Sequence, residues 1–271
     1  MLDKKFFIGV DSDGTAFDSM TIKHTDSFIP AMFEVWGLDG VRERAAEIEQ
    51  YINLYSKDRG INRFPGLYMT FEQMKKEKIF DEDISDLDAF IKSGRGFSTK
   101  ALEDFILETN SDFLKKVLEW NNLSDELFAE NCKDIQPFNF VKQSFEKAKD
   151  KADIGVISSA TREGLETDWK GGGIAQYASV ILGKENGNKK EQLRGEAHGK
   201  YDKDKILMIG DAIGDLEAAK SIDALFYPII AGEEEKSWEK FYNEALDKFF
   251  DGSYADEYEK SLIDAFYQRF N

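Results

Sequence analysis

The sequence predicts an α/β fold in which a parallel sheet carries a large all-helical insert, and three observations support this. Five short apolar runs are nearly continuous rather than alternating, which is typical of parallel strands covered on both faces. The last four runs are separated by segments long enough for helical crossovers, such as Asp211–Ser221. Between the first and second runs the apolar spacing is helical, with no strand-like alternation. The expected strands are Phe6–Val10, Ile154–Ser158, Ser179–Gly183, Ile206–Gly210 and Phe226–Ile230.

The insert is expected to be a domain of amphipathic helices. Its apolar side chains recur at helical spacing, as Ile48, Ile52 and Tyr55 do. We place its boundaries so that residues 1–18 and 150–271 form the α/β core and residues 19–149 form the helical domain. The acidic, aromatic-rich segment 232–271 is expected to add helices that pack on the core. The helices expected in the insert are Ser27–Trp36, Val41–Ser56, Phe71–Lys78, Leu87–Lys92, Thr99–Leu107, Ser111–Trp120 and Pro137–Lys149.

Composition and charge narrow the possible partners. The formal net charge of −17 argues against general nucleic-acid affinity, because phosphate backbones are bound by Lys and Arg. No apolar run approaches the roughly 20 residues needed to cross a bilayer, and the apolar residues before Asp11 are too few for a signal-peptide core. Cys132 is the only cysteine, which favours a reducing compartment. We therefore expect a cytoplasmic protein that binds neither nucleic acid nor membrane.

Residues capable of chemistry follow three of the expected strands. Ligands bind beyond the carboxyl ends of the strands in open parallel sheets, so these residues should converge. Acidic groups brought together repel one another unless a cation neutralises them, and oxygen ligands of this kind suit Mg²⁺ best. The metal would also permit a carboxylate to attack an anionic phosphate. The three strand ends are Asp11-Ser12-Asp13-Gly14-Thr15, Ser158-Ser159 and Gly210-Asp211 with Asp215.

The neutral residues of these turns are suited to an anion. Gly14 would let the backbone turn tightly and approach a phosphate closely. The Ser158 hydroxyl and the amide of Ser159, at a strand-to-helix turn, could donate hydrogen bonds to phosphoryl oxygens. Taken alone, two serines after a strand are often only turn chemistry, and an aspartate such as Asp211 can be a helix N-cap. It is the combination, in this order and after apolar strands, that is specific.

A calcium-binding loop is the main alternative for the first motif, because Asp-x-Asp-Gly also opens EF-hand loops. That loop requires a third acidic ligand and a Glu at its twelfth position. The corresponding residues here are Thr15 and Ile22, and a strand instead of a helix precedes the motif.

With these motifs the sequence resembles the haloacid dehalogenase (HAD) superfamily. The family's motif one, strand–Asp-x-Asp-x-Thr, is matched by Asp11, Asp13 and Thr15. Its motif two, a strand ending in Ser or Thr, is matched by Ser158, and its motif four, Gly-Asp-x-x-x-Asp, by Gly210, Asp211 and Asp215. The resemblance implies a Rossmann-like parallel sheet core and identifies the insert as a C1-type helical cap domain.

The family's motif three is a lysine that opens the helix before motif four, and three lysines compete for it. Lys184, Lys189 and Lys190 all lie in the segment after the third strand. The family often has Lys-Pro-x-Pro there, whereas this sequence has Lys189-Lys190-Glu191-Gln192 without the prolines. We favour Lys189, which would stand at the start of the helix and hold the transferring phosphoryl group as a point charge.

The insert offers one further candidate for substrate binding. Residues 59–66, Arg-Gly-Ile-Asn-Arg-Phe-Pro-Gly, look like a turn between helices. Arg59 and Arg63 could meet a second anion or sugar hydroxyls of the substrate. The alternative is a solvated loop without a role in binding.

By resemblance, the expected function is Mg²⁺-dependent hydrolysis of a small phosphorylated metabolite, with sugar phosphates among the candidates. Asp11 would be the nucleophile that forms an aspartyl-phosphate, and Asp13 the general acid and base. Two alternatives remain: a phosphomutase of the β-phosphoglucomutase type, and a non-catalytic phosphoryl-binding protein. The implied metal ligands are Asp11, the Asp13 carbonyl, Asp211 and Asp215, and the implied phosphoryl-binding residues are Gly14, Thr15, Ser158, Ser159 and Lys189.

Overall fold

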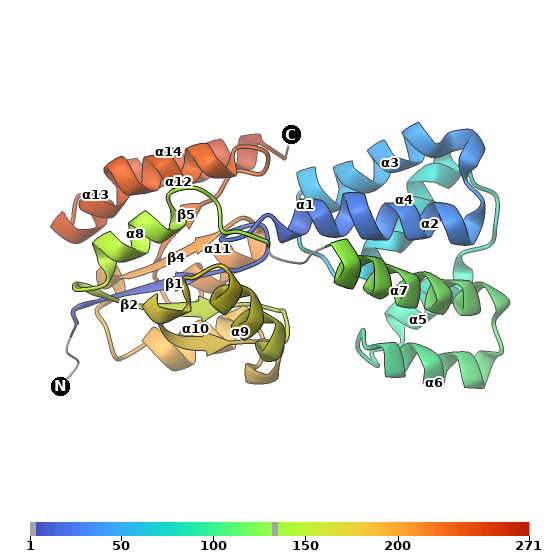
Figure 1. Cartoon of the computed structure of the whole chain (residues 1–271), viewed down its shortest axis with the longest axis horizontal. Coiled ribbons are helices and arrows are strands. Elements are labelled where there is room, and N and C mark those ends of the chain that lie inside the picture. Colours follow the sequence, from blue (N-terminus) through green and yellow to red (C-terminus); the bar gives the residue numbers. More distant parts are fainter. Residues whose placement is uncertain (1–3, 132–134, 271) are drawn as a thin grey trace. The chain divides into compact units, whose positions relative to one another are not determined.

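The structure is a computed structural model that describes residues 4–131 and 135–270. Cys132, on which the expected reducing compartment partly depends, lies outside the described residues. The chain divides into two compact units (Figure 1). Unit 1 comprises Met1–Met20 and Asp134–Asn271, and unit 2 comprises Thr21–Lys133. Among the described residues, no helix is both long and apolar enough to cross a membrane.

Unit 1 is built on a five-stranded parallel sheet with the strand order β3-β2-β1-β4-β5. β1 is the central strand, and it pairs with β2 on one side and with β4 on the other. Each strand is four to six residues long, and most residues of β1, β2, β4 and β5 are buried, as the apolar runs predicted. β3, at the edge of the sheet, differs: Leu182 is buried, whereas its other residues are partly or fully exposed. The strands are β1 Phe6–Val10, β2 Ala152–Ile157, β3 Ala178–Leu182, β4 Ile206–Gly210 and β5 Leu225–Pro228.

Helices cover both faces of this sheet, so the sheet has two cores. Along β1 the side chains alternate, with Phe6, Ile8 and Val10 in one core and Phe7 in the other. The first core receives α8, α9, α12, η7 and α13, and the second receives α10 and α11. The helical elements over residues 135–270 are α8 Val141–Ala148, α9 Arg162–Gly171, η4 Ala175–Tyr177, η5 Lys184–Asn186, α10 Lys189–Ala197, η6 Lys203–Lys205, α11 Ile213–Lys220, α12 Glu234–Lys240, η7 Phe241–Ala245, α13 Leu246–Asp251 and α14 Glu257–Gln268.

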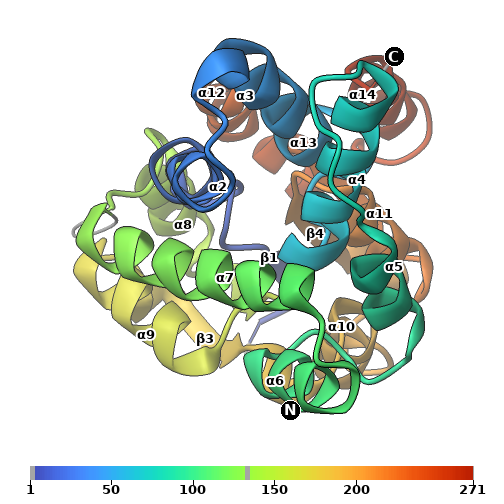
Figure 2. The same ribbon diagram turned by 90° about the vertical axis from the view of Figure 1, so that its right-hand side faces the viewer.

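The secondary structure of unit 2 is all helical over its described residues, and the unit has a separate hydrophobic core. Its longest helix, α7, packs against α2, α5 and α6, while α3 packs on α4 (Figure 2). α1, Ser19–Lys23, crosses from unit 1 into unit 2. The other elements are η1 His24–Phe28, α2 Ile29–Trp36, η2 Asp39–Val41, α3 Arg42–Gln50, η3 Tyr51–Tyr55, α4 Arg63–Lys76, α5 Ser85–Lys92, α6 Thr99–Thr109 and α7 Asp112–Asn131.

The boundary between the units lies earlier than expected, at residues 133 and 134 instead of 149 and 150. The helix expected over Pro137–Lys149 is α8, and its Val141 and Phe145 side chains are fully buried in the first core of unit 1. Sequence spacing reveals that a helix has an apolar face, but it does not reveal which core receives that face. The helix was therefore assigned to the wrong unit.

The turn expected over residues 59–66 is also shorter than predicted, because α4 begins inside it at Arg63. The Asn62 side chain accepts a hydrogen bond from the amide of Phe64 and caps the helix. Pro65 falls in the first turn, where its missing N–H has no partner to lose. The proline and glycine that suggested a turn thus mark the start of a helix.

Candidate active site

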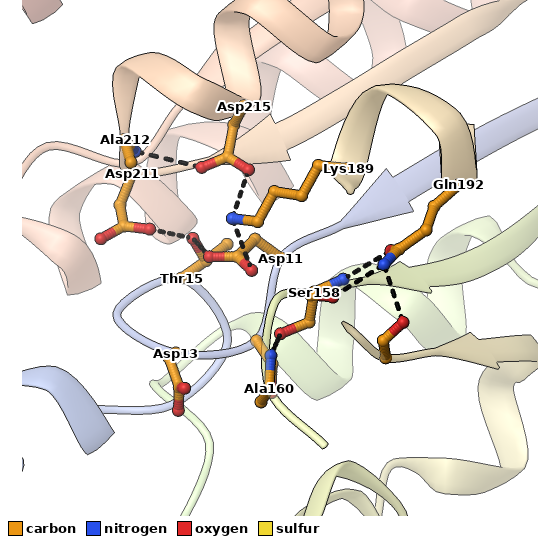
Figure 3. A network of polar contacts seen from close by, with 12 residues as sticks. Asp11, Asp13, Thr15, Ser158, Ala160, Lys189, Gln192, Asp211, Ala212 and Asp215 are labelled. Carbon is orange, nitrogen blue, oxygen red and sulfur yellow. Dashed lines mark hydrogen bonds and ion pairs between the residues drawn. The ribbon is translucent and has the colours of Figure 1, made fainter. Parts of the chain in front are cut away.

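The residues at the carboxyl ends of β1, β2 and β4 converge as the parallel topology requires. β1 lies between β2 and β4 and is the strand at which the strand order reverses. The loop after β1 supplies Asp11, the segment after β4 supplies Asp211 and Asp215, and the first residue of α10 supplies Lys189 (Figure 3). All three aspartates are buried, with at most 4% of their surface exposed.

The loop after β1 folds back on itself and is held by hydrogen bonds from its own backbone and from two tryptophan side chains. The carbonyl of Ser12 accepts hydrogen bonds from three backbone amides, those of residues 15–17. Gly14 has a φ of 75°, a conformation in which a residue without Cβ is favoured. The indole of Trp169 donates to Ser12 Oγ over 3.0 Å, and the indole of Trp238 donates to the carbonyl of Thr15 over 2.7 Å. The position of Asp11 is therefore fixed by side chains from two distant helices.

Asp11, Asp211 and Asp215 form a cluster in which one carboxylate oxygen from each lies within 4.8 Å of the others. Lys189 Nζ contacts Asp11 Oδ1 at 2.9 Å and Asp215 Oδ1 at 2.7 Å (Figure 3). Thr15 Oγ1 donates to Asp211 Oδ1 over 2.7 Å. The cluster thus holds three carboxylates beside one ammonium group.

This excess of buried negative charge affects the ionisation of the cluster. Burial raises the pKa of Asp11 well above its usual value; Lys189 opposes this shift, and the neighbouring Asp215 and Asp211 add to it. Burial likewise raises the pKa of Asp215 against the attraction of Lys189. Burial by itself would lower the pKa of Lys189, but the nearby carboxylates of Asp11 and Asp215 outweigh it and raise that pKa. The ammonium therefore stays charged.

The donor set of the cluster fits a hard divalent cation. All the donors are oxygens, they lie close together, and their charge exceeds what Lys189 supplies. Mg²⁺ and similar ions are bound by carboxylate and carbonyl oxygens of this kind. A divalent ion would also favour the ionised form of Asp11.

The other two lysines considered for motif three lie elsewhere. Lys190 is exposed and pairs with Glu217 at 2.9 Å, and Lys184 is exposed at the start of η5. Asn188 and Glu191 form a capping box that starts α10, which places Lys189 in the first turn. Lys189 is therefore the lysine of this segment that reaches Asp11.

The remaining core candidates are arranged around this cluster. Ser158 is buried directly after β2, and its hydroxyl accepts a hydrogen bond from the amide of Ala160. Ser159 is exposed. Asp13 is partly exposed; it accepts a short hydrogen bond from Ser19, and its carboxylate points away from the aspartate cluster in Figure 3. Asp13 is thus in the same loop as Asp11 without belonging to the cluster.

The two arginines expected to bind substrate belong to unit 2. Arg59 is buried, and its guanidinium donates to the carbonyl of Leu54 over 2.8 Å. Arg63 forms an ion pair with Asp125 at 2.6 Å and lies over the ring of Phe28. Both guanidinium groups therefore have partners within their own unit.

Three residues that support the site were not found from the sequence. Trp169 and Trp238 anchor the loop after β1, and the buried Gln192 bonds to the backbone of Ser158. The two tryptophans carry no motif, because any large apolar residue would satisfy the same pattern. Gln192 could have been noticed in the sequence, because it belongs to the Lys189–Gln192 segment, which departs from the family's Lys-Pro-x-Pro.

Three solved structures are similar to this chain. A predicted phosphoglycolate phosphatase from Haemophilus somnus 129pt is 16% identical, with coverage of 85% of this chain and 87% of that chain and a TM-score of 0.51. A haloacid dehalogenase-like family hydrolase from Xanthomonas campestris is 13% identical, with 84% of each chain covered and a TM-score of 0.47. A dehalogenase is 12% identical, with coverage of 84% and 86% and a TM-score of 0.44. At such identities the likeness concerns the fold alone.

No curated protein matches the sequence. The family model described as haloacid dehalogenase-like hydrolase matches residues 61–227. This range is more than half of the chain and contains Ser158, Lys189, Asp211 and Asp215, while Asp11 precedes it. With the α/β fold and the carboxylate cluster described above, the match establishes that this chain belongs to the haloacid dehalogenase-like hydrolases.

Proposed function

We propose that this hydrolase is a Mg²⁺-dependent phosphatase that acts on a small phosphorylated metabolite through an aspartyl-phosphate on Asp11. The observation that carries the proposal is the contact of the buried Asp11 carboxylate with Lys189, inside a cluster completed by Asp211 and Asp215. A carboxylate can attack phosphorus only where the repulsion between two anions is offset, and a lysine with a divalent cation offsets it.

In the first step, an Asp11 carboxylate oxygen forms a bond to phosphorus while the bond from phosphorus to the substrate's alkoxy oxygen breaks. Asp13 gives its proton to the departing oxygen, so an alcohol leaves and Asp11 carries the phosphoryl group. In this structure the Asp13 carboxylate points away from the aspartate cluster and accepts a hydrogen bond from Ser19, so we propose that its side chain rotates before it acts (Figure 3).

In the second step, water attacks the phosphorus and the Asp13 carboxylate takes up a proton from it. The bond from phosphorus to the Asp11 oxygen breaks, which restores the carboxylate and releases inorganic phosphate. Lys189, Ser158, Ser159 and the turn at Gly14 and Thr15 are proposed to hold the phosphoryl oxygens, the first by charge and the others by hydrogen bonds.

A Mg²⁺ ion would be held by the Asp11 and Asp211 carboxylates and the Asp13 carbonyl, with Asp215 bound directly or through water. Bound there, the ion would neutralise charge on the transferring group. The residues of the chain bring these oxygens together, hold the charged Lys189 beside them, and move the proton at Asp13.

A panel of phosphorylated metabolites, read by release of inorganic phosphate with and without Mg²⁺, tests the proposal. We include phosphoglycolate and sugar phosphates, together with p-nitrophenyl phosphate as a generic ester. Release of phosphate that depends on Mg²⁺ and is lost in Asp11→Asn supports the proposal, because an amide of nearly equal size is a poor nucleophile. Substantial residual turnover in that variant would contradict it.

The role of Asp13 separates ester hydrolysis from other hydrolytic reactions. A positioned acid contributes roughly 10²–10⁴-fold when the leaving group is an alkoxide. Asp13→Ala should therefore hydrolyse alkyl phosphates very slowly. With p-nitrophenyl phosphate, the rate of the first step should fall less, since nitrophenolate leaves without a proton. With p-nitrophenyl phosphate the aspartyl-phosphate should then accumulate and be trapped by acid quench. Normal hydrolysis of alkyl phosphates by this variant would remove Asp13 from the mechanism, and an isomerised sugar phosphate as product would indicate a mutase.

A further inference from the structure

The buried amide of Gln192 joins two loops that end at the active site. Its Oε1 accepts the backbone N–H of Ser158 over 3.0 Å. Its Nε2 faces three carbonyls, those of Ser158 at 2.9 Å, Gly183 at 2.9 Å and Gly187 at 2.8 Å. Three acceptors around an NH₂ group and one donor beside the oxygen leave a single favourable orientation of the amide, the one drawn in Figure 3.

The two loops that Gln192 joins are already in backbone contact. The amide of Lys184 donates to the carbonyl of Ala160 over 2.8 Å, and the amide of Arg162 donates to the Glu185 carboxylate over 3.1 Å. A Cβ at Gly183 would lie 2.5 Å from the backbone nitrogen of Arg162, so only glycine fits at this approach. The segment after β2 and the segment after β3 therefore form one body, with the Gln192 amide at its centre.

Gln192 lies three residues after Lys189 on α10, so the helix that presents Lys189 also carries the group that holds Ser158. In the family's usual Lys-Pro-x-Pro, prolines limit the backbone at this point. This chain lacks them and has instead a capped helix start and a glutamine that bonds to both loops. The glutamine stands at the place of the second proline of that pattern.

From this geometry we propose that Gln192 is a positioning residue, which sets the backbone of Ser158 relative to Lys189 so that both can hold one phosphoryl group. The proposal rests on the phosphatase function proposed above. Gln192 does not contact the aspartate cluster: its bonds go to the loops after β2 and β3, whereas the aspartates follow β1 and β4. Its loss should therefore weaken phosphate binding and leave the affinity for Mg²⁺ unchanged.

Two variants separate the contributions of the amide. Gln192→Met keeps the length of the side chain and removes all of its hydrogen bonds. Gln192→Glu keeps the acceptor for the Ser158 amide but turns a carboxylate oxygen toward three carbonyls, which is repulsive. Gln176→Met is the control, because the amide of Gln176 also donates to a carbonyl, that of Gly173, but on an exposed part of unit 1.

The experiment uses the full chain with p-nitrophenyl phosphate, and inorganic phosphate serves as the competitive inhibitor. We expect each Gln192 variant to raise the inhibition constant of phosphate at least tenfold and to lower kcat/KM, while the Mg²⁺ concentration for half-maximal activity stays within twofold of the parent. Gln176→Met should match the parent in all three. A parental inhibition constant in Gln192→Met would overturn the proposal. So would an equal loss of Mg²⁺ affinity, or failure of both variants to fold, since either would mark a purely structural residue.

Amide hydrogen exchange distinguishes this proposal from the proposed function. In both Gln192 variants the segments 158–162 and 183–188 should exchange faster than in the parent, while the segment 11–17 keeps its parental rate. Unchanged exchange in the first two segments would overturn the positioning role whatever the activity. If the parent neither hydrolyses phosphate esters nor binds phosphate, the proposed function fails. The exchange rates then show by themselves whether Gln192 holds the segments 158–162 and 183–188 in place.

Discussion

Replacing Lys189 with methionine tests the charge balance of the aspartate cluster directly. The methionine keeps the apolar part of the side chain and removes the ammonium that lies 2.9 Å from Asp11 and 2.7 Å from Asp215. The three buried carboxylates would then face one another without a cation from the chain. We expect the metal-free variant to be less stable than the parent, and Mg²⁺ to restore much of the difference.

The expected magnitude follows from the two contacts. At an effective dielectric constant of about 20, each contact corresponds to about 6 kcal/mol of direct attraction, most of which offsets the cost of burying the ammonium. Removing one partner of a buried pair typically lowers the free energy of unfolding by about 3–5 kcal/mol. A change of that size lowers the Tm of a unit of this length by roughly 6–20 °C.

Thermal unfolding in EDTA and in a Mg²⁺ series measures both effects. The rise in Tm on adding Mg²⁺ should be larger in Lys189→Met than in the parent, because the ion no longer competes with an ammonium group. Lys190→Met is the matched control: its partner Glu217 and its own side chain are exposed, so the change should be at most about 1 kcal/mol. A metal-free Lys189→Met with the parental Tm, or with a smaller response to Mg²⁺, would refute the reasoning.

Three further changes test other parts of the structure. In Gly210→Ala the new Cβ would lie 2.3 Å from the Cβ of Asp215, so half-maximal activity should need at least about tenfold more Mg²⁺. Gly214→Ala is the control and should leave that concentration unchanged, because its Cβ would have no atom within 4 Å apart from its chain neighbours and the backbone of its own helix. Trp238→Phe leaves a buried carbonyl without its donor; the free energy of unfolding in urea should fall by about 1–3 kcal/mol and turnover should fall with it, and an unchanged turnover would contradict the anchoring of the loop. Arg63→Ala should impair the best metabolite substrate and spare p-nitrophenyl phosphate; equal losses would indicate a structural role.

The sheet could be predicted closely from the sequence because its strands are short and apolar, and all but the edge strand β3 are mostly buried. Phe6–Val10 and Ile206–Gly210 have the predicted bounds, and the other three strands differ by one or two residues at their ends. A short, continuous apolar run is typical of a strand buried in a parallel sheet, so the pattern predicts both the kind of element and its position in the core. The same reasoning led to the three strand ends, whose convergence follows from parallel topology alone.

The sequence could not predict contacts between distant segments that no motif links. Nothing in the spacing of Trp238 indicates that its indole meets the carbonyl of Thr15, because an apolar helix face describes only that a side chain is buried. The choice between Lys189 and its neighbour Lys190 depended on where α10 begins, and the capping box at Asn188 settles that point. Side-chain packing, rather than composition, positions these residues.

The central place of β1 has a consequence for synthesis on the ribosome. A nascent chain emerges from its N-terminus, and domains generally fold as units while it does so. Unit 2 is contiguous and has its own core, so it is complete once residue 133 has emerged, whereas β1 at that moment still lacks both of its neighbours. β2 and β4 follow later, and the indole that anchors the loop after β1 belongs to Trp238. A chain interrupted before that residue would lack the indole that bonds to Thr15, so the loop that carries Asp11 has both of its tryptophan anchors only after the last segment has been translated.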